Sequence, residues 1–353
     1  MKIKAGFLNL AVYLLFYSAN AYYVQQNTIL IYSKNTIAIN KILNKFNIQY
    51  ENIQNKNYSD DNLYIISGDA SSMHVATLPK YYIFHQTSNL HKGLSANALT
   101  LFSNAIAVWD CSWDNINRYK NRIKNYYYLP DENYEFLDPI ILPCFLPIKA
   151  LSAYRKLLEY SNSKPSDISM HVPGLFCHCV FQNPELIIEA GVRWGDGSTI
   201  PLYEAKKLLN SYLIGLDIVN YSHIYSKLNS CLFLQINDLE FPLYLQQKIN
   251  IQKKEIDFVF IDTTHDYLHT KKEIEMFTSI LSKHGTLGFH DSNPLPGDPD
   301  GVKIALKEYF NLNFDESRYG NYIVKKDQDM WNIIHYPFCN GMTIAKRIEK
   351  FVL

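Results

Sequence analysis

The second half of the chain repeats one pattern five times: a short apolar run followed by a stretch with helical periodicity. The runs span residues 186–188, 212–216, 232–235, 258–261 and 286–289. Short buried strands that alternate with helices form a parallel sheet with helices on its faces. Two further apolar runs, at 322–324 and 331–335, have no helix between them and indicate antiparallel strands. We therefore predict an α/β domain whose mostly parallel, seven-stranded sheet has an antiparallel end.

The first half of the chain contains a looser version of the same alternation. Its apolar runs span residues 29–33, 63–66, 81–84 and 105–109. With a helical face at 39–46, they predict a smaller α/β domain over residues 26–145. Prolines and a predicted helix at 150–159 mark residues 146–180 as a linker, which leaves 181–353 for the larger domain. A chain of 353 residues is long enough to fill two hydrophobic cores.

Residues 1–25 form a separate hydrophobic segment with two interpretations. Two lysines precede an apolar stretch at 10–17, and Ala19-Asn20-Ala21 has the small-x-small form of a signal-peptidase site. The alternative is an additional N-terminal helix packed on the first domain. In either case the apolar run is too short for a stable membrane span. A cleaved secretion signal and a retained helix both remain open.

The charge balance of the chain excludes one class of partner. The chain has 34 Lys and Arg residues and 34 Asp and Glu residues. It therefore has no long-range positive field that would gather a polyanion and release its counterions. We expect no nucleic acid partner.

A glycine-rich loop follows the first strand of the larger domain. Its candidate ligand-binding residues are Glu189, Gly191, Gly195, Gly197 and Ser198. Glycine lets the backbone approach a ligand at a sharp strand-to-helix turn, and open parallel sheets bind ligands at the carboxyl ends of their strands. The loop lacks the third glycine of a dinucleotide fingerprint, and its acids favour a cationic ligand, which disfavours a nicotinamide-dependent oxidoreductase. Asp217 ends the next strand, where an acid can accept hydrogen bonds from ribose hydroxyls.

Acids and histidines close the fourth and fifth strands. Asp262 ends the fourth strand, His265 follows three residues later, and His290 and Asp291 end the fifth. Because neighbouring parallel strands end at the same edge, we expect these four side chains to meet. Two carboxylates and a histidine suit a divalent cation, which lowers the pKa of a bound hydroxyl. His265, with an ordinary pKa near 6.5, would then act as the general base.

In this order the motifs resemble class I S-adenosylmethionine-dependent methyltransferases, over residues 181–345. The matching motifs are Glu189-x-Gly191-x-x-x-Gly195-x-Gly197, Leu216-Asp217-Ile218, Ile261-Asp262-x-x-His265 and Gly285-x-x-x-Phe-His290-Asp291. More narrowly, they resemble the group that contains cephalosporin-hydroxylase-like proteins and macrolide-sugar O-methyltransferases. The resemblance implies a Rossmann-like methyltransferase domain with S-adenosylmethionine as its cofactor.

The resemblance also implies roles for individual residues. The glycines of the loop shape the S-adenosylmethionine pocket, Asp217 holds the ribose, and Asp238 faces the adenine, with the adjacent Asn237 as an alternative. In the sugar-methylating relatives three acids hold the metal. Here the corresponding residues are Asp262, His290 and Asp291. Because His290 replaces an acid, Mg²⁺, Mn²⁺ and a metal-free site all remain open.

Residues 81–86 and 107–115 are similar to the N-terminal half of two-domain glycosyltransferases. This similarity implies that the first domain binds an acceptor or serves as a scaffold, and a plain packing domain is the alternative. We expect an O-methyltransferase that acts on a hydroxyl of a saccharide or glycoconjugate, with a small-molecule or glycan acceptor as its partner. The alternative is a non-catalytic glycan-binding protein that keeps the same fold. Use of S-adenosylmethionine favours the cytoplasm, the N-terminal segment favours secretion or membrane association, and a homo-oligomer remains open.

Overall fold

The computed structural model divides the chain into two compact units, Met1–Lys164 and Pro165–Leu353. The structure describes residues 29–32, 40, 50–53, 58–60, 62–70, 73, 78–87, 90, 93–110, 112–119, 122–123, 126–128, 142–164, 166–247, 255–315, 317–318 and 320–348. The hydrophobic segment at 1–25 and almost all of the helix predicted at 39–46 lie outside these residues. The boundary between the units falls inside the stretch that the sequence marks as a linker.

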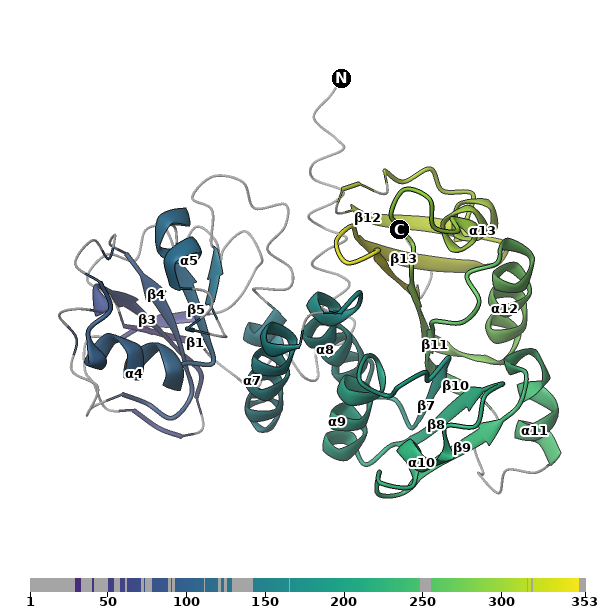
Figure 1. Cartoon of the computed structure of the whole chain (residues 1–353), viewed down its shortest axis with the longest axis horizontal. Coiled ribbons are helices and arrows are strands. Elements are labelled where there is room, and N and C mark those ends of the chain that lie inside the picture. Colours follow the sequence, from purple (N-terminus) through teal and green to yellow (C-terminus); the bar gives the residue numbers. More distant parts are fainter. Residues whose placement is uncertain are drawn as a thin grey trace. The chain divides into compact units, whose positions relative to one another are not determined.

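The first unit contains a six-stranded sheet in the order β2-β1-β3-β4-β5-β6, and every strand pair in it is parallel. The strands are β1 (Ile29–Tyr32), β2 (Tyr50–Asn52), β3 (Tyr64–Gly68), β4 (Tyr82–Gln86), β5 (Ala107–Asp110) and β6 (Tyr126–Tyr128). The helices are α4 (Ala96–Asn104), α5 (Trp113–Tyr119), the short 3-10 helix η3 (Leu142–Phe145) and α7 (Ile148–Ser163). Figure 1 shows α4 and α5 beside this sheet. The smaller α/β domain is confirmed, and β2 and β6 escaped prediction because each is only three residues long.

Polar side chains close the loops at the carboxyl ends of β4 and β5. Asp110 accepts hydrogen bonds from the Ser112 backbone N–H (2.7 Å) and the Asn115 side-chain amide (2.9 Å). Asn115 in turn accepts one from the Leu90 backbone N–H (2.9 Å). Asp110 and Asn115 are 0% and 1% exposed, so these bonds satisfy buried groups. They therefore order the loops of this sheet edge.

The second unit contains an eight-stranded sheet in the order β12-β13-β14-β11-β10-β7-β8-β9. The strands are β7 (Leu186–Ala190), β8 (Tyr212–Asp217), β9 (Cys231–Gln235), β10 (Ile256–Ile261), β11 (Leu281–His290), β12 (Gly320–Lys326), β13 (Asp329–Tyr336) and β14 (Met342–Ile348). β7 to β11 pair in parallel, and β12 to β14 are antiparallel. The predicted fold class is confirmed. The sheet has one strand more than predicted, because β14 follows the Asn340–Gly341 turn and inserts between β11 and β13.

Helices cover both faces of this sheet. They are η4 (Ser169–His171), α8 (Val172–Gln182), α9 (Thr199–Leu209), α10 (Ser222–Tyr225), η5 (Asp238–Glu240), α11 (Phe241–Gln247), α12 (Tyr267–Ile280) and α13 (Gly301–Tyr309). In Figure 1, α8 and α9 lie on one side of the sheet, and α11, α12 and α13 on the other. Apolar side chains of α11, α12 and α13 join those of the strands in one buried core. No helix among the described residues is long and apolar enough to cross a membrane.

The strand order reverses between β7 and β10. From β7 the chain continues outward through β8 and β9, and it then returns to the other side of β7 to form β10 and β11. Loops at the carboxyl ends of β7 and β10 therefore leave in opposite directions. Open α/β sheets bind their ligands in the crevice at such a switch point.

Candidate active site

A cavity of about 420 Å³ opens at the carboxyl ends of β7 to β10. Its lining includes Gly191, Asp217, Asp238, Asp262 and His265. Four other residues predicted for the ligand, Glu189, Gly195, Gly197 and Ser198, are not among the lining residues. The cavity thus brings together predicted residues from four different strand ends.

Gly191 allows the loop after β7 to cross the end of β10. Its φ is +86°, and a Cβ at this position would lie 1.9 Å from the carbonyl oxygen of Asp262. The backbone N–H of Gly191 donates to Leu216 O (2.9 Å), while that of Asp262 donates to Ala190 O (2.8 Å). A side chain would break this packing, so the position requires glycine.

Backbone N–H groups hold the Asp217 carboxylate at the cavity wall. Its Oδ2 accepts hydrogen bonds from the N–H groups of Val192 (2.9 Å) and Arg193 (3.3 Å), and its Oδ1 accepts one from Val219 (2.8 Å). An ionised carboxylate offers about four acceptor positions, so capacity remains for a ligand hydroxyl. Asp217 is thus a fixed acceptor at the end of β8.

Glu189 lies beneath the loop and holds it to the sheet. Its carboxylate accepts hydrogen bonds from the hydroxyls of Ser198 (2.6 Å), Thr199 (2.8 Å) and Tyr225 (2.5 Å). The side chain is 0% exposed. Burial raises the pKa of Glu189 to about 7, although the three hydroxyls oppose this shift. Glu189 and Ser198 therefore fix the loop from behind, and a direct ligand contact by either residue stays a prediction.

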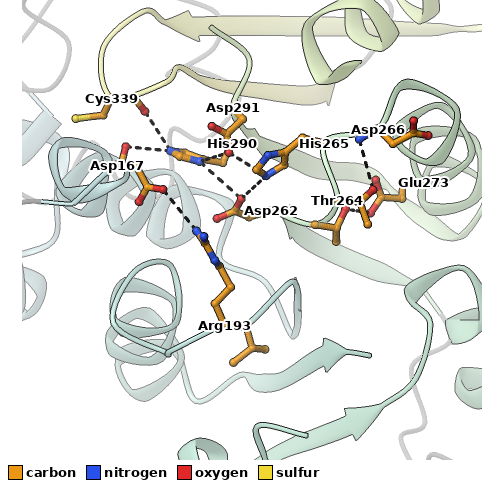
Figure 2. Close-up of polar contacts among 12 residues, drawn as sticks. Asp167, Arg193, Asp262, Thr264, His265, Asp266, Glu273, His290, Asp291 and Cys339 are labelled. Carbon is orange, nitrogen blue, oxygen red and sulfur yellow. Dashed lines mark hydrogen bonds and ion pairs between the residues drawn. The ribbon is translucent and has the colours of Figure 1, made fainter. Parts of the chain in front are cut away.

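Asp262, His265, His290 and Asp291 form one group, called here the first cluster. His265 Nε2 lies 3.1 Å from Asp262 Oδ1 and 3.0 Å from Asp291 Oδ2. His290 Nδ1 lies 2.8 Å from Asp291 Oδ2 and 3.7 Å from Asp262 Oδ1. Figure 2 shows both imidazole rings turned toward the two carboxylates. The four residues that the sequence expected to meet do so.

The first cluster holds protons strongly. Hydrogen bonds to Asp262 and Asp291 raise the pKa of His265 to about 9. Burial would lower the pKa of His290, but its hydrogen bonds to the same two acids outweigh burial and raise it to about 10. Burial opposes the shift at Asp291, yet the two histidines hold its pKa well below the usual range. At neutral pH the cluster therefore carries two positive and two negative charges.

The raised pKa of His265 changes its predicted role. The sequence assigned it a pKa near 6.5 and the role of general base. With a pKa of about 9, Nε2 carries a proton at pH 7 whenever Asp262 and Asp291 face it without another cation. A divalent cation on the two carboxylates would replace that interaction and leave the nitrogen free to accept a proton.

His290 is oriented from both ring nitrogens. Its Nε2 lies 3.2 Å from the carbonyl oxygen of Asp167 and 3.1 Å from that of Cys339, so the Nε2–H group donates a hydrogen bond to these carbonyls. The ring is 1% exposed. A histidine that donates one N–H to a backbone carbonyl and turns its other nitrogen toward carboxylates has the orientation of a metal ligand. The donor atoms of Asp262, His290 and Asp291 lie within 4.8 Å of one another, so these three residues could hold an ion.

Three residues around the site adopt left-handed backbone geometry that is uncommon for non-glycine residues. The φ angles are +47° for Arg193, +57° for His265 and +55° for Asp291. Such conformations cost on the order of 1 kcal/mol each and persist where the surrounding structure enforces them. Their concentration around one cavity is typical of a functional site.

Asp238 also reaches the cavity, but in a group that the sequence did not reveal. Asp238 Oδ1 lies 3.1 Å from His269 Nε2, which in turn lies 3.6 Å from Glu273 Oε1. Asn237, the alternative to Asp238, accepts a hydrogen bond from the Leu239 N–H and so begins η5. The spacing His269-x-x-x-Glu273 was a usable signal, because residues four apart share one helix face.

Comparisons with known proteins find matches among solved structures. No protein-family model matches the chain, and no curated protein matches it. A SAH-bound methyltransferase from Podospora anserina is 14% identical, with a TM-score of 0.37, covering 56% of this chain and 88% of its own. An O-methyltransferase from Bacillus cereus in complex with SAH is 16% identical, with a TM-score of 0.36 and coverage of 56% and 91%.

A third structure is the MycE methyltransferase of the mycinamycin pathway, in complex with Mg, SAH and mycinamycin VI. It is 16% identical, with a TM-score of 0.38, covering 60% of this chain and 61% of its own. Because these identities and TM-scores are low, the activity of this chain is inferred below from its own residues.

Proposed function

We propose that the chain is an S-adenosylmethionine-dependent O-methyltransferase that acts on a hydroxyl of a saccharide or glycoconjugate. One observation carries this proposal: a single cavity is lined by the Asp217 carboxylate and by Asp262 and His265 of the first cluster. A donor held at Asp217 and an acceptor hydroxyl held at Asp262 would share one cavity. Alignment of donor and acceptor is the main demand of methyl transfer.

The cavity fits the cofactor in size and chemistry. Its volume of about 420 Å³ lies within the range of small-molecule sites. Asp217 retains acceptor capacity for ribose hydroxyls, and Gly191 lets the loop lie close to the ligand. The Asp217 carboxylate at the end of β8 suits a positively charged ligand. Bound there, S-adenosylmethionine would supply an activated methyl group on a sulfonium.

The first cluster would activate the acceptor. Asp262, His290 and Asp291 are the residues that would hold Mg²⁺ or Mn²⁺, and such an ion lowers the pKa of a bound hydroxyl. His265 would accept the proton of that hydroxyl at Nε2, once the two carboxylates no longer hold a proton there. Its Nε2 already lies within about 3 Å of both acids, so it needs no large movement to do so.

Aromatic side chains near the cavity favour a saccharide acceptor. Tyr221 lines the cavity, and the ring of Trp194 contacts it edge to face at 6.4 Å between centroids. Trp194 is 75% exposed, although an indole ordinarily gains from burial. An exposed aromatic face of this kind can stack on the apolar face of a sugar ring.

Calorimetric titration of the full chain with S-adenosylmethionine and SAH tests the cofactor. We expect the wild type to bind both compounds. The affinity of Asp217→Ala should be lower by at least about tenfold, because the carboxylate that accepts hydrogen bonds from the ribose hydroxyls is gone. Asp196→Ala is the control for loss of an acid, because Asp196 is an exposed acid of the neighbouring glycine-rich loop after β7. Equal affinity in the wild type and Asp217→Ala would overturn the pocket assignment.

The reaction is tested by SAH formation with a panel of mono- and oligosaccharides and Mn²⁺. Release of SAH that depends on the saccharide supports the O-methyltransferase. Saccharide binding without any S-adenosylmethionine binding would instead support the alternative of a non-catalytic glycan-binding protein.

A further inference from the structure

Asp238, His269 and Glu273 form a second cluster at the cavity, separate from the first. Asp238 lies in η5 just after β9, while His269 and Glu273 lie four residues apart on α12 and thus on one face of the helix. Their donor atoms lie within 4.8 Å of one another. In Figure 2, Glu273 lies on the opposite side of His265 from Asp167 and Cys339.

Two buried carboxylate oxygens in this cluster lack a hydrogen-bond partner among the described residues: Asp238 Oδ2 and Glu273 Oε2. Asp238 is 7% exposed and Glu273 is 0% exposed. A buried carboxylate without compensation is costly, and two that face each other repel. Burial and the neighbouring Asp238 carboxylate raise the pKa of Glu273 well above its usual range, so either a shared proton or a bound cation compensates the pair.

The geometry of the donors suits a metal ion. Bonds of roughly 2.0–2.2 Å from an ion to nitrogen and oxygen place neighbouring donors about 3–3.5 Å apart. His269 Nε2 lies 3.1 Å from Asp238 Oδ1 and 3.6 Å from Glu273 Oε1. The Thr263 hydroxyl donates to Glu273 Oε1 at 2.7 Å and fixes that carboxylate, as outer-shell partners of metal ligands do.

The cavity provides access to this cluster. Asp238 and His269 both line it, and their side chains are 9% and 20% exposed. Glu273 closes the inner side, with its side chain 0% exposed. An ion could therefore enter from the cavity and keep open coordination positions on that side.

We propose that Asp238, His269 and Glu273 bind a divalent cation of the Mn²⁺ or Zn²⁺ type. Imidazole nitrogen favours Zn²⁺ and other transition metals, and carboxylates suit Mn²⁺, so this mixed donor set suits these two ions. The two carboxylates balance the charge of the ion. The site does not depend on the proposed methyl transfer, since its argument uses only these three side chains.

A proton shared by the two carboxyl groups is the competing explanation. It would also satisfy the two unpartnered oxygens, and Glu273→Gln separates the alternatives. The glutamine amide can donate a hydrogen bond to Asp238 in place of the shared proton. The substitution nevertheless removes a charged metal ligand. His269→Gln removes the nitrogen ligand and serves as a second variant on the more exposed side of the cluster.

The experiment is a titration of the chelator-treated full chain with Mn²⁺, followed by the electron paramagnetic resonance signal of free Mn²⁺ and by the melting temperature. We expect Glu273→Gln and His269→Gln each to bind one Mn²⁺ fewer per chain than the wild type. Asp291→Asn, a change in the first cluster, should retain this uptake; asparagine tolerates the φ of +55° at that position.

Wild-type stoichiometry and wild-type melting-temperature gain in both second-cluster variants would overturn the proposal in favour of the shared proton. The proposal would also be overturned if Asp291→Asn abolished all Mn²⁺ uptake of the wild type, because the first cluster would then account for every bound ion. If Glu273→Gln fails to fold, His269→Gln alone decides. Binding of S-adenosylmethionine is measured separately by calorimetry, so failure of this proposal and failure of the proposed function are distinguishable.

Discussion

His265 Nε2 lies 3.0 Å from Asp291 Oδ2, the same oxygen that His290 Nδ1 approaches at 2.8 Å. One carboxylate oxygen thus serves two imidazoles, and Asp262 faces both rings from the other side. The raised pKa values of the histidines follow from this arrangement. The charges of the two protonated histidines already balance those of the two carboxylates. A metal ion that binds here must therefore displace protons from the histidines.

Binding of Mn²⁺ to the first cluster should therefore release about two protons at pH 7. Both histidines carry a proton at that pH, since their pKa values are about 9 and about 10. Calorimetry in two buffers with different ionisation enthalpies measures the number of protons released. The titration uses Glu273→Gln, so that the second cluster does not contribute.

His265→Asn is the control for this titration. Asparagine tolerates the left-handed backbone at position 265. Because it lacks the titrating imidazole, the number of protons released on Mn²⁺ binding should fall to about one. A binding enthalpy that does not depend on the buffer would contradict the assigned protonation of the cluster.

Gly191→Ala should destabilise the second unit by about 2–4 kcal/mol and abolish cofactor binding. The added Cβ would lie 1.9 Å from the backbone oxygen of Asp262. Gly297→Ala is the matched control, because Gly297 also has a positive φ (+101°) but has nothing within 4 Å of an added Cβ. Urea denaturation of the two variants thus separates the steric clash from the backbone strain, and equal losses would argue against the clash.

Ionisation of Glu189 should lower the free energy of unfolding as the pH rises from about 5 to 8. Its folded pKa of about 7 exceeds the ordinary value of 4.5. Between those values the folded state holds a proton that the unfolded state has lost, so the free energy of unfolding falls with rising pH. A shift of this size corresponds to about 3 kcal/mol.

Glu189→Gln removes this titration. The free energy of unfolding of Glu189→Gln relative to the wild type should therefore rise by about 2–3 kcal/mol between pH 5 and pH 8. Glu275→Gln, on the exposed face of α12, controls for the loss of an acid. A difference between Glu189→Gln and wild type that stays constant with pH would refute the raised pKa.

The sequence could predict which residues end the strands but not which way their side chains turn. Asp217, Asp262 and Asp291 follow apolar runs, and parallel strands place such residues at one edge. The sequence could not place the side chain of Glu189, because all five residues of β7 are buried and no alternation shows which face it takes. It turns toward Tyr225, a residue 36 positions away.

Interactions between distant residues set the rest of the site. The pKa of His265 depends on both Asp262 and Asp291, so the ordinary value read from the sequence was too low. The His269 and Glu273 spacing was visible on α12, but its third member, Asp238, lies 31 residues before His269. Only the folded sheet brings η5 against α12.

Trp194→Ala should weaken binding of a saccharide acceptor about fivefold and leave S-adenosylmethionine affinity unchanged. The indole is 75% exposed and contacts Tyr221 at the cavity. Loss of aromatic stacking is worth about 1 kcal/mol, which is about fivefold in affinity. Trp194→Phe should retain most of the affinity, because the stacking face remains. Titration of each variant with the saccharide that supports the fastest SAH release measures both effects, and an equal loss in Ala and Phe would point to a contact other than stacking.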